Sequence, residues 1–278
     1  MSARPLVDHS RLSINTATTR AQWTLAEAIK GYATLGVRGI SVWRDQLADC
    51  GQKEAARLLA DHGMTVTGLC RGGMFPAATA AERQAAIDDN LRAIEEAVAI
   101  GAQCLVLVVG GLPKGSKDIA GARSMVLDGL SAILEFARSA GMPLAIEPLH
   151  PMYAADRACV NTMAQANDLC DRLGPGVGIA VDVYHVWWDP DLEREISRAG
   201  SRILAFHICD WLVPTRDLLL DRGMMGDGVI DIPRIRGWVE AAGYDGFHEV
   251  EIFSAETWWK RDPNEVVNTC KERYLTVV

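Results

Sequence analysis

The 278 residues of this chain carry a formal net charge of −8, with 28 lysines and arginines against 36 aspartates and glutamates. That balance argues against a nucleic acid or an anionic membrane as a partner held by bulk electrostatics. No apolar stretch is long enough to cross a bilayer, and the first eleven residues lack the apolar core of a secretory signal. We therefore expect a cytoplasmic protein that binds neither nucleic acid nor membrane.

The seven cysteines lie far apart and form no CxxC pair, so neither a disulfide framework nor a structural zinc site is expected. An odd number of thiols in mostly apolar surroundings is typical of a reducing cytosol. No segment has the composition of a linker or of a low-complexity tract. We therefore predict a single domain over residues 1–278.

Short apolar runs alternate with longer amphipathic segments along the whole chain, as buried parallel strands alternate with helices. The expected strands lie near residues 11–15, 37–42, 64–70, 103–109, 143–147, 177–182, 203–208 and 246–252. The expected helices lie near residues 24–35, 52–62, 80–100, 119–140, 161–172, 191–199, 232–242 and 263–275.

Residues suited to helix termini stand at many of these boundaries. Thr24, Thr79 and Asn161 occupy expected N-cap positions, and Asp231 and Asp262 come shortly before a proline near a helix start. Several expected helices end at a glycine that the next strand follows. These signals support the predicted boundaries.

Eight strand–helix pairs fit a (β/α)₈ TIM barrel, an α/β fold that typically takes about 250 residues. The alternative is a doubly wound open sheet, which often carries a nucleotide-binding glycine motif. GLCRGG at 68–73 has the wrong glycine spacing, and VVGGLPKGS at 108–116 lacks the phosphate-loop spacing. We therefore predict the barrel.

Four successive apolar runs late in the chain each end on an acidic or imidazole side chain. The runs are PLAIE, GIAVD, ILAFH and HEVE, and we call their last residues the four donors: Glu147, Asp182, His207 and Glu251. Because strand ends converge on one face of a barrel, we expect these side chains to form one divalent-metal site. Glu249 shares the side-chain parity of Glu251, and we expect it to be a buried partner of a basic residue.

Several longer segments carry a resemblance to a known family. The chain resembles the xylose isomerase-like barrel superfamily, in the branch of sugar phosphate isomerases and epimerases. That branch includes ketose 3-epimerases, hydroxypyruvate isomerase and inosose-processing enzymes. The matching segments are IEPLHP (146–151), VDVYHV (181–186), FHICD (206–210), GMMGDGVIDIPRI (223–235) and GYDGFHEVEIF (243–253).

The resemblance implies that the four donors bind one divalent ion. Manganese is the expected ion, with magnesium, cobalt and zinc as alternatives. It also implies that Glu147 and Glu251 act as the catalytic bases, and that His185, three residues after Asp182, contacts the substrate.

An arginine shortly before the G-x-G loop contacts substrate oxygens in this family. Arg222 stands directly before GMMGDG, but the insertion WLVPTRDLLL makes Arg216 a competitor, and both stay open. We expect the stretch 211–228 to fold over the barrel mouth. The alternative is that this stretch forms a subunit contact in a homodimer or tetramer.

Other residues after strand ends are candidates for substrate contacts. His150 is either a contact at the site or a solvated loop residue, and Trp211 either stacks on a sugar or belongs to an interface. The same two readings apply to Trp43, Trp187, Trp188, Trp258 and Trp259. Arg44 and Arg71 either bind a substrate phosphate or carboxylate or pair with acidic residues of the mouth.

These expectations favour an isomerase or epimerase that removes a proton next to the carbonyl of a small ketose, a keto-polyol or their phosphates. The alternative is a metal-dependent lyase or hydrolase, for keto-glycoside cleavage or inosose dehydratase-like chemistry, at the same site. A DNA-repair endonuclease on this barrel would need three zinc ions and a basic groove. Six histidines and the net charge of −8 argue against it.

Overall fold

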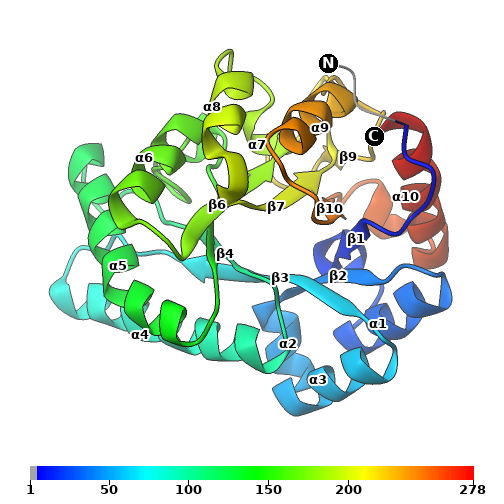
Figure 1. The fold of residues 1–278 in the computed structure, drawn as a ribbon, viewed down its shortest axis with the longest axis horizontal. Coiled ribbons are helices and arrows are strands. Elements are labelled where there is room, and N and C mark those ends of the chain that lie inside the picture. The colour runs from blue at the N-terminus through cyan, green and yellow to red at the C-terminus, as the bar shows by residue number, and fades with distance from the viewer. Residues whose placement is uncertain (1–4) are drawn as a thin grey trace.

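Eight parallel strands close into a barrel with the helices arranged outside it, as Figure 1 shows for the computed structural model, which describes residues 5–278. Around the barrel the strands follow the order β1, β10, β7, β6, β5, β4, β3, β2. The predicted TIM barrel and its eight strands are confirmed. The strands are β1 (Leu12–Asn15), β2 (Gly39–Trp43), β3 (Thr65–Gly73), β4 (Leu105–Val108), β5 (Leu144–Ile146), β6 (Val177–Asp182), β7 (Ile203–Ile208) and β10 (His248–Val250).

The eight predicted helices are present, and two short ones were not predicted. The predicted set is α1 (Leu25–Thr34), α3 (Gln52–Asp61), α4 (Ala80–Ala99), α5 (Ile119–Ser139), α6 (Met163–Leu173), α8 (Leu192–Ala199), α9 (Ile232–Ala241) and α10 (Pro263–Val277). The additional helices, α2 (Arg44–Cys50) and α7 (Val183–Val186), start directly from the last residues of β2 and β6. Between residues 5 and 278, no helix is both long and apolar enough to span a bilayer.

The helix caps follow the predicted residues with one correction. Thr24 and Thr79 form capping boxes, and Asp231 and Asp262 cap α9 and α10. The cap of α6 is Thr162, whose hydroxyl accepts from the Gln165 amide, rather than Asn161. The side-chain amide of Asn161 instead donates to the carbonyls of Leu149 and Ala158, which fixes the loop after β5. Four 3₁₀ helices complete the elements: η1 (Thr16–Thr19), η2 (Pro151–Tyr153), η3 (Gly200–Arg202) and η4 (Trp258–Lys260).

The barrel interior is built from small and polar side chains. One buried cluster consists of Cys70, Cys104, Val106, Ala145, Ala180 and Ala205. Ser13, Asn15, Thr67 and Glu249 are also buried, with Ser13 2.9 Å from Thr67 through their hydroxyl oxygens. Large aliphatic side chains lie in the separate, larger cluster between strands and helices. Small residues therefore leave room inside the barrel for the polar groups that end β5, β6, β7 and β10.

The inserted stretch after β7 forms a small antiparallel ribbon. Its strands are β8 (Asp210–Trp211) and β9 (Arg222–Gly223). The hydroxyl of Tyr184, on α7, donates to the carbonyl of Leu218 at 2.8 Å. The Trp211 ring packs on Tyr184 with centroids 4.7 Å apart. The ribbon therefore lies against the element that follows β6, on the side where the strands end.

The end of β3 is held by a buried asparagine. Asn90 on α4 accepts from the Gly73 amide at 2.6 Å and donates to the Gly73 carbonyl at 2.7 Å. Gly73 has φ +108°, and a Cβ there would lie 2.0 Å from the carbonyl oxygen of Val108. Only glycine fits this position, because a side chain would meet backbone.

We expect Asn90→Ala to lower the free energy of unfolding by about 2–4 kcal/mol, because two buried backbone groups lose their partners. Urea unfolding followed by circular dichroism measures this change. Gln84→Ala on the same helix is the control, since Gln84 is exposed and contacts only Asp88. An equally small change in both variants would show that the clamp is not stabilising.

Candidate metal centre

The four donors lie together at the ends of four neighbouring strands. One ligand atom from each lies within 4.8 Å of those of the others. Asp182 and His207 are paired across β6 and β7, and Glu147 and Glu251 come directly after β5 and β10. All four are buried, with at most 6% of any residue exposed. The expectation from sequence that they converge is met by this geometry.

The surroundings of His207 fit a bound cation. Neither ring nitrogen has a hydrogen-bond partner among the described residues, although the residue is fully buried. Nδ1 lies 3.2 Å from Glu147 Oε1 and 3.8 Å from Glu251 Oε2, but not in hydrogen-bond geometry. Buried carboxylates around an unbonded imidazole are costly unless a cation joins them. This donor set suits one divalent ion and is permissive among manganese, magnesium, cobalt and zinc.

Glu249 lies next to the four donors but its oxygens are engaged elsewhere. They accept from Asn15 Nδ2 and from Thr67 Oγ1, both at 2.8 Å. One of them also lies 3.4 Å from His207 Nε2. His207 is thus the basic partner that the sequence led us to expect, and the other two neighbours are neutral.

The structure separates the two candidate arginines. Arg222 is buried, and its Nη1 donates to Asp182 at 2.9 Å and to Glu251 at 3.1 Å. Its guanidinium lies over the Tyr184 ring, 4.4 Å from the centroid. Arg216 instead pairs with Asp221 and has a half-exposed side chain. Arg222 therefore lies at the donors and Arg216 does not, while the contact of either with a substrate stays a prediction.

His185 and His150 form a second layer beside the donors. His185 Nε2 lies 3.1 Å from Arg222 Nη2, and its Nδ1 accepts from the backbone amide of His150 at 3.2 Å. Burial lowers the pKa of His185 to about 3 despite the opposing charge of Asp182, so its ring is neutral at pH 7. The ring of His150 stacks on Trp211 at 5.0 Å. Both sequence-predicted histidines therefore lie near the donors.

The electrostatics of the donors differ from one carboxylate to the next. Burial raises the pKa of Glu251 to about 8, against the lowering effect of Arg222 and His207. Burial alone would raise the pKa of Asp182, but Arg222 in particular holds it below its usual value. Burial alone would lower the pKa of His207, yet Glu249, Glu251 and Glu147 raise it well above its usual value.

Asn15 is a site residue that the sequence analysis did not identify. Its side-chain amide donates to Glu251 at 3.0 Å as well as to Glu249. Its carbonyl oxygen accepts from the Trp43 indole at 2.8 Å, which fixes the orientation of the amide. The available signal was a polar residue at the end of the first apolar run, in the same position as the four donors on their strands.

The tryptophans after strand ends fall into two groups around the donors. Trp211 packs on Trp187 with centroids 5.8 Å apart, and Trp188 packs edge-on to His150 at 5.7 Å. Trp43 and Trp259 both pack on Phe253, at 5.5 and 6.1 Å. Stacking on a sugar and contact with another subunit both stay predictions for these rings.

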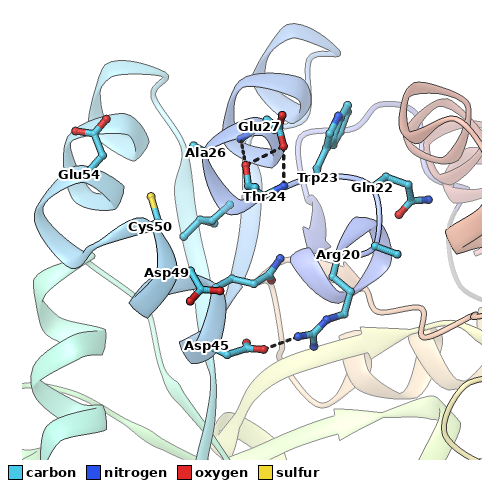
Figure 2. A pocket seen from close by; sticks show the side chains of 13 residues that line it. Arg20, Gln22, Trp23, Thr24, Ala26, Glu27, Asp45, Asp49, Cys50 and Glu54 are labelled. Atoms are coloured by element: carbon cyan, nitrogen blue, oxygen red, sulfur yellow. Dashed lines mark hydrogen bonds and ion pairs between the residues drawn. The ribbon is translucent and has the colours of Figure 1, made fainter.

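A cavity of about 580 Å³ lies between residues 20–27 and 45–54 (Figure 2). Dashed lines in Figure 2 join Arg20 to Asp45, and Thr24 to Glu27 in the cap of α1. None of the four donors lines this cavity. It is therefore distinct from the candidate metal centre.

Known proteins share this fold and sequence pattern. A family model described as xylose isomerase-like TIM barrel matches residues 29–268. The inosose isomerase of Halalkalibacterium halodurans is 26% identical over 158 residues, which cover 54% of this chain and 52% of that protein. The L-ribulose-5-phosphate 3-epimerase UlaE of Salmonella typhi is 26% identical over 128 residues, 46% of this chain and 42% of that protein. The matches thus span about half of the length of these relatives.

Solved structures extend the likeness to nearly the whole chain. Protein SMc04130 from Sinorhizobium meliloti 1021 is 61% identical, with a TM-score of 0.96 over 97% of this chain and 99% of that one. The IOLI protein, solved with a zinc atom bound, has a TM-score of 0.83 at 21% identity, over 96% of this chain and 98% of that one. At that identity the second likeness shows the fold alone.

Replacing His207 by Ala should weaken the binding of one manganese ion per chain at least about 100-fold. Losing a ligand costs more affinity than losing a residue that only hydrogen-bonds to a ligand. Isothermal titration calorimetry measures the affinity. His62→Ala is the matched control, since the His62 ring contacts only the Leu58 carbonyl on α3. Equal manganese affinity in both variants would contradict the site.

Metal affinity should also fall as pH falls, because a proton on His207 competes with the ion. The raised pKa of His207 keeps it protonated at pH 7, and the pKa of Glu251 of about 8 has the same effect. Binding should therefore release about one to two protons and tighten as pH rises. Calorimetry in buffers of different ionisation enthalpy counts them, and a pH-independent affinity would refute this prediction.

Proposed function

Because this chain belongs to the xylose isomerase-like TIM barrel family, we propose that it is a divalent-metal-dependent isomerase or epimerase of a small ketose, keto-polyol or their phosphates. One observation carries the proposal: two carboxylates, Glu147 and Glu251, approach the same nitrogen of His207 from two strands. The activities named for the inosose isomerase and the 3-epimerase support it. The zinc bound by the IOLI protein, which has the same fold, supports a divalent metal as the cofactor.

The chemical need is to acidify a proton on the carbon next to a carbonyl. Removing that proton leaves negative charge on the carbonyl oxygen, which water alone stabilises poorly. A divalent ion held by the four donors supplies Lewis-acid stabilisation of that charge. The protein must then place a base on the carbon and return the proton.

Glu147 and Glu251 are placed for these proton transfers. They follow β5 and β10, which flank β6 and β7 in the barrel. A carbon between them can lose its proton to a carboxylate oxygen of one and regain it from the other on the opposite face, which inverts the centre. Return by the same carboxylate to the former carbonyl carbon, with the adjacent hydroxyl proton passing to the former carbonyl oxygen, would instead isomerise the sugar. Such general acid–base help is worth roughly 10²–10⁴ in rate.

The neighbouring groups hold Glu251 in a fixed orientation. Asn15 donates to one of its oxygens and Arg222 to the other. Arg222 also lies 3.1 Å from His185, so the guanidinium and the imidazole form one edge of the site. We propose that this edge binds the hydroxyl oxygens of the substrate. A carboxylate held from both sides needs little reorganisation before it accepts a proton.

A second candidate function is elimination at the same site, and the position of His150 favours it. A lyase needs an additional group that transfers a proton to the leaving oxygen. His150 lies beside His185, and burial lowers its pKa, so its neutral ring is a base rather than an acid at pH 7. The lowered pKa leaves little protonated His150 at pH 7 to donate to a leaving group, so isomerisation remains the first proposal.

Glu147→Gln and Glu251→Gln should each reduce C–H exchange by at least about 100-fold, because a base is lost. The manganese-loaded protein is incubated with ketoses and inososes in deuterium oxide, and exchange is followed by NMR. Glu256→Gln is the control, since Glu256 is exposed and pairs with Lys260. An epimer or isomer supports the proposal, and loss of water or an aglycone supports elimination. Undiminished exchange in Glu147→Gln would rule out the two-carboxylate mechanism.

His185→Ala should raise KM about tenfold or more, since a buried contact to substrate oxygen is lost. It should leave manganese affinity within about twofold, because His185 is not one of the four donors. Steady-state kinetics and calorimetry on the same preparation separate the two effects. If His185→Ala lost its affinity for manganese but kept the wild-type KM, His185 would be assigned to metal binding instead.

A further inference from the structure

A second pocket, of about 360 Å³, lies at the ends of β2 and β3 and adjoins the candidate metal centre. The residues that line it are Arg20, Trp43, Arg44, Asp45, Cys70, Arg71, Gly72, Gly73, Met74 and Asp89. Two of them contact Asn15: the Trp43 indole donates to its carbonyl oxygen, and Cys70 Sγ lies 3.7 Å from its amide nitrogen. Asn15 in turn bonds to Glu251. Asn15 therefore links the lining of this pocket to one of the four donors.

The charges in the pocket are not balanced. Arg20 pairs with Asp45. Arg44 pairs with Asp89 at 2.8 Å and with Glu96 of α4 at 2.6 Å, which leaves it no free edge for a substrate. Both acidic side chains that line the pocket, Asp45 and Asp89, are thus already paired with Arg20 or Arg44.

Arg71 is the arginine that remains. None of residues 5–278 hydrogen-bonds to its guanidinium or forms an ion pair with it, although the side chain is only partly exposed. Burial lowers the pKa of Arg71, and the positive charge of Arg157 lowers it further, while Glu147 opposes the change. The group still carries its charge at pH 7. A cation without a counter-ion in a partly desolvated pocket destabilises the protein unless an anion joins it.

Arg157 comes to this place from a different part of the chain. Its carbonyl accepts from the Gly110 amide, so its loop runs beside the residues that follow β4. The residues after β3 bond to the same segment, since the Phe75 amide donates to the Val109 carbonyl. Arg71 and Arg157 therefore flank the end of β4 from its two sides.

The surroundings of Arg157 offer a further donor. Its guanidinium lies over the Tyr153 ring, 5.5 Å from the centroid, and forms no hydrogen bond or ion pair with any described residue. The Tyr153 hydroxyl is buried and has no hydrogen-bond partner among residues 5–278. The same ring packs edge-on to His185 at 5.9 Å. An unpartnered hydroxyl and two unpaired guanidiniums thus border the site from the β3–β5 side.

We propose that Arg71 and Arg157 bind an oxyanion on the substrate, a phosphate or a carboxylate, so that the enzyme acts on anionic rather than neutral sugars. The inference rests on the proposed function and adds the substrate class to it. Guanidinium groups match the oxygens of both anions through paired N–H bonds. The Tyr153 hydroxyl donates a further bond, and the keto end of the same molecule lies toward the four donors.

The test compares a neutral ketose, its phosphate and the corresponding keto-sugar acid on the manganese-loaded enzyme. We expect kcat/KM for one of the two anions to exceed that for the neutral sugar at least about 100-fold. Arg71→Met and Arg157→Met should each lower that value about 10- to 100-fold and leave the neutral sugar within about twofold. A higher kcat/KM for the phosphate indicates a phosphate subsite, and a higher kcat/KM for the keto-sugar acid indicates a carboxylate subsite.

Matched variants control for charge and folding. Arg172→Met removes an exposed arginine at the far end of α6 and should change neither substrate preference nor activity. Arg71→Lys keeps the charge without the planar fork and should retain part of the preference. Circular dichroism and manganese content verify each variant. A neutral sugar used as well as either anion, or a preference that survives in both Met variants, would overturn the subsite.

A binding measurement separates this proposal from the proposed function. Inorganic phosphate is titrated into the manganese-loaded wild type and the double Arg→Met variant. Phosphate bound at the ion persists in the double variant, whereas phosphate bound by the arginines is lost. If no sugar exchanges a proton but this loss is seen, the proposed function fails and the anion subsite stands. Equal phosphate affinity in the two proteins overturns the subsite, whatever the activity.

Discussion

The burial of four carboxylates in one barrel mouth is the constraint on which the site depends. When ionised, Glu147, Asp182, Glu249 and Glu251 carry four negative charges, and Arg222 supplies one positive charge, which leaves three in excess. Excess buried charge of one sign is removed by protons or by a metal. The raised pKa values of Glu251 and His207 mean that bound protons offset part of the excess charge. A divalent ion would offset it instead. The same balance explains why Arg222 must be buried.

The fold and the four donors could be predicted from sequence because both depend on local patterns. A buried strand is a short apolar run, and a polar residue at its end is visible without any knowledge of neighbours. In a barrel the C-terminal ends of all strands lie on one face. Identifying the last residue of each strand in the sequence was therefore sufficient to predict that the four donors lie together. The short helices α2 and α7 were not predicted because each starts at a strand end with no intervening turn. The shift of the α6 cap from Asn161 to Thr162 arises because Asn161 bonds to the preceding loop instead.

Contacts between distant segments set the remaining details, and no local pattern encodes them. Asn15 reaches Glu251 across 236 positions of sequence, because β1 and β10 close the barrel. The choice between Arg216 and Arg222 depended on the ribbon, which directs Arg222 inward and leaves Arg216 with Asp221. The free guanidinium of Arg71 could be recognised only once Arg44 was seen to pair with α4.

The bond between Asn15 and Glu251 has a consequence for the order in which the protein matures. The first strand can pair with β2 soon after it is made, but Asn15 bonds to Glu251 only after the last strand has left the ribosome and closed the barrel. Glu251 is the last of the four donors to be synthesised, so the nascent chain carries an incomplete set of donors until then. Under the proposed function, the complete set of four donors is therefore available to an ion only after the barrel has closed.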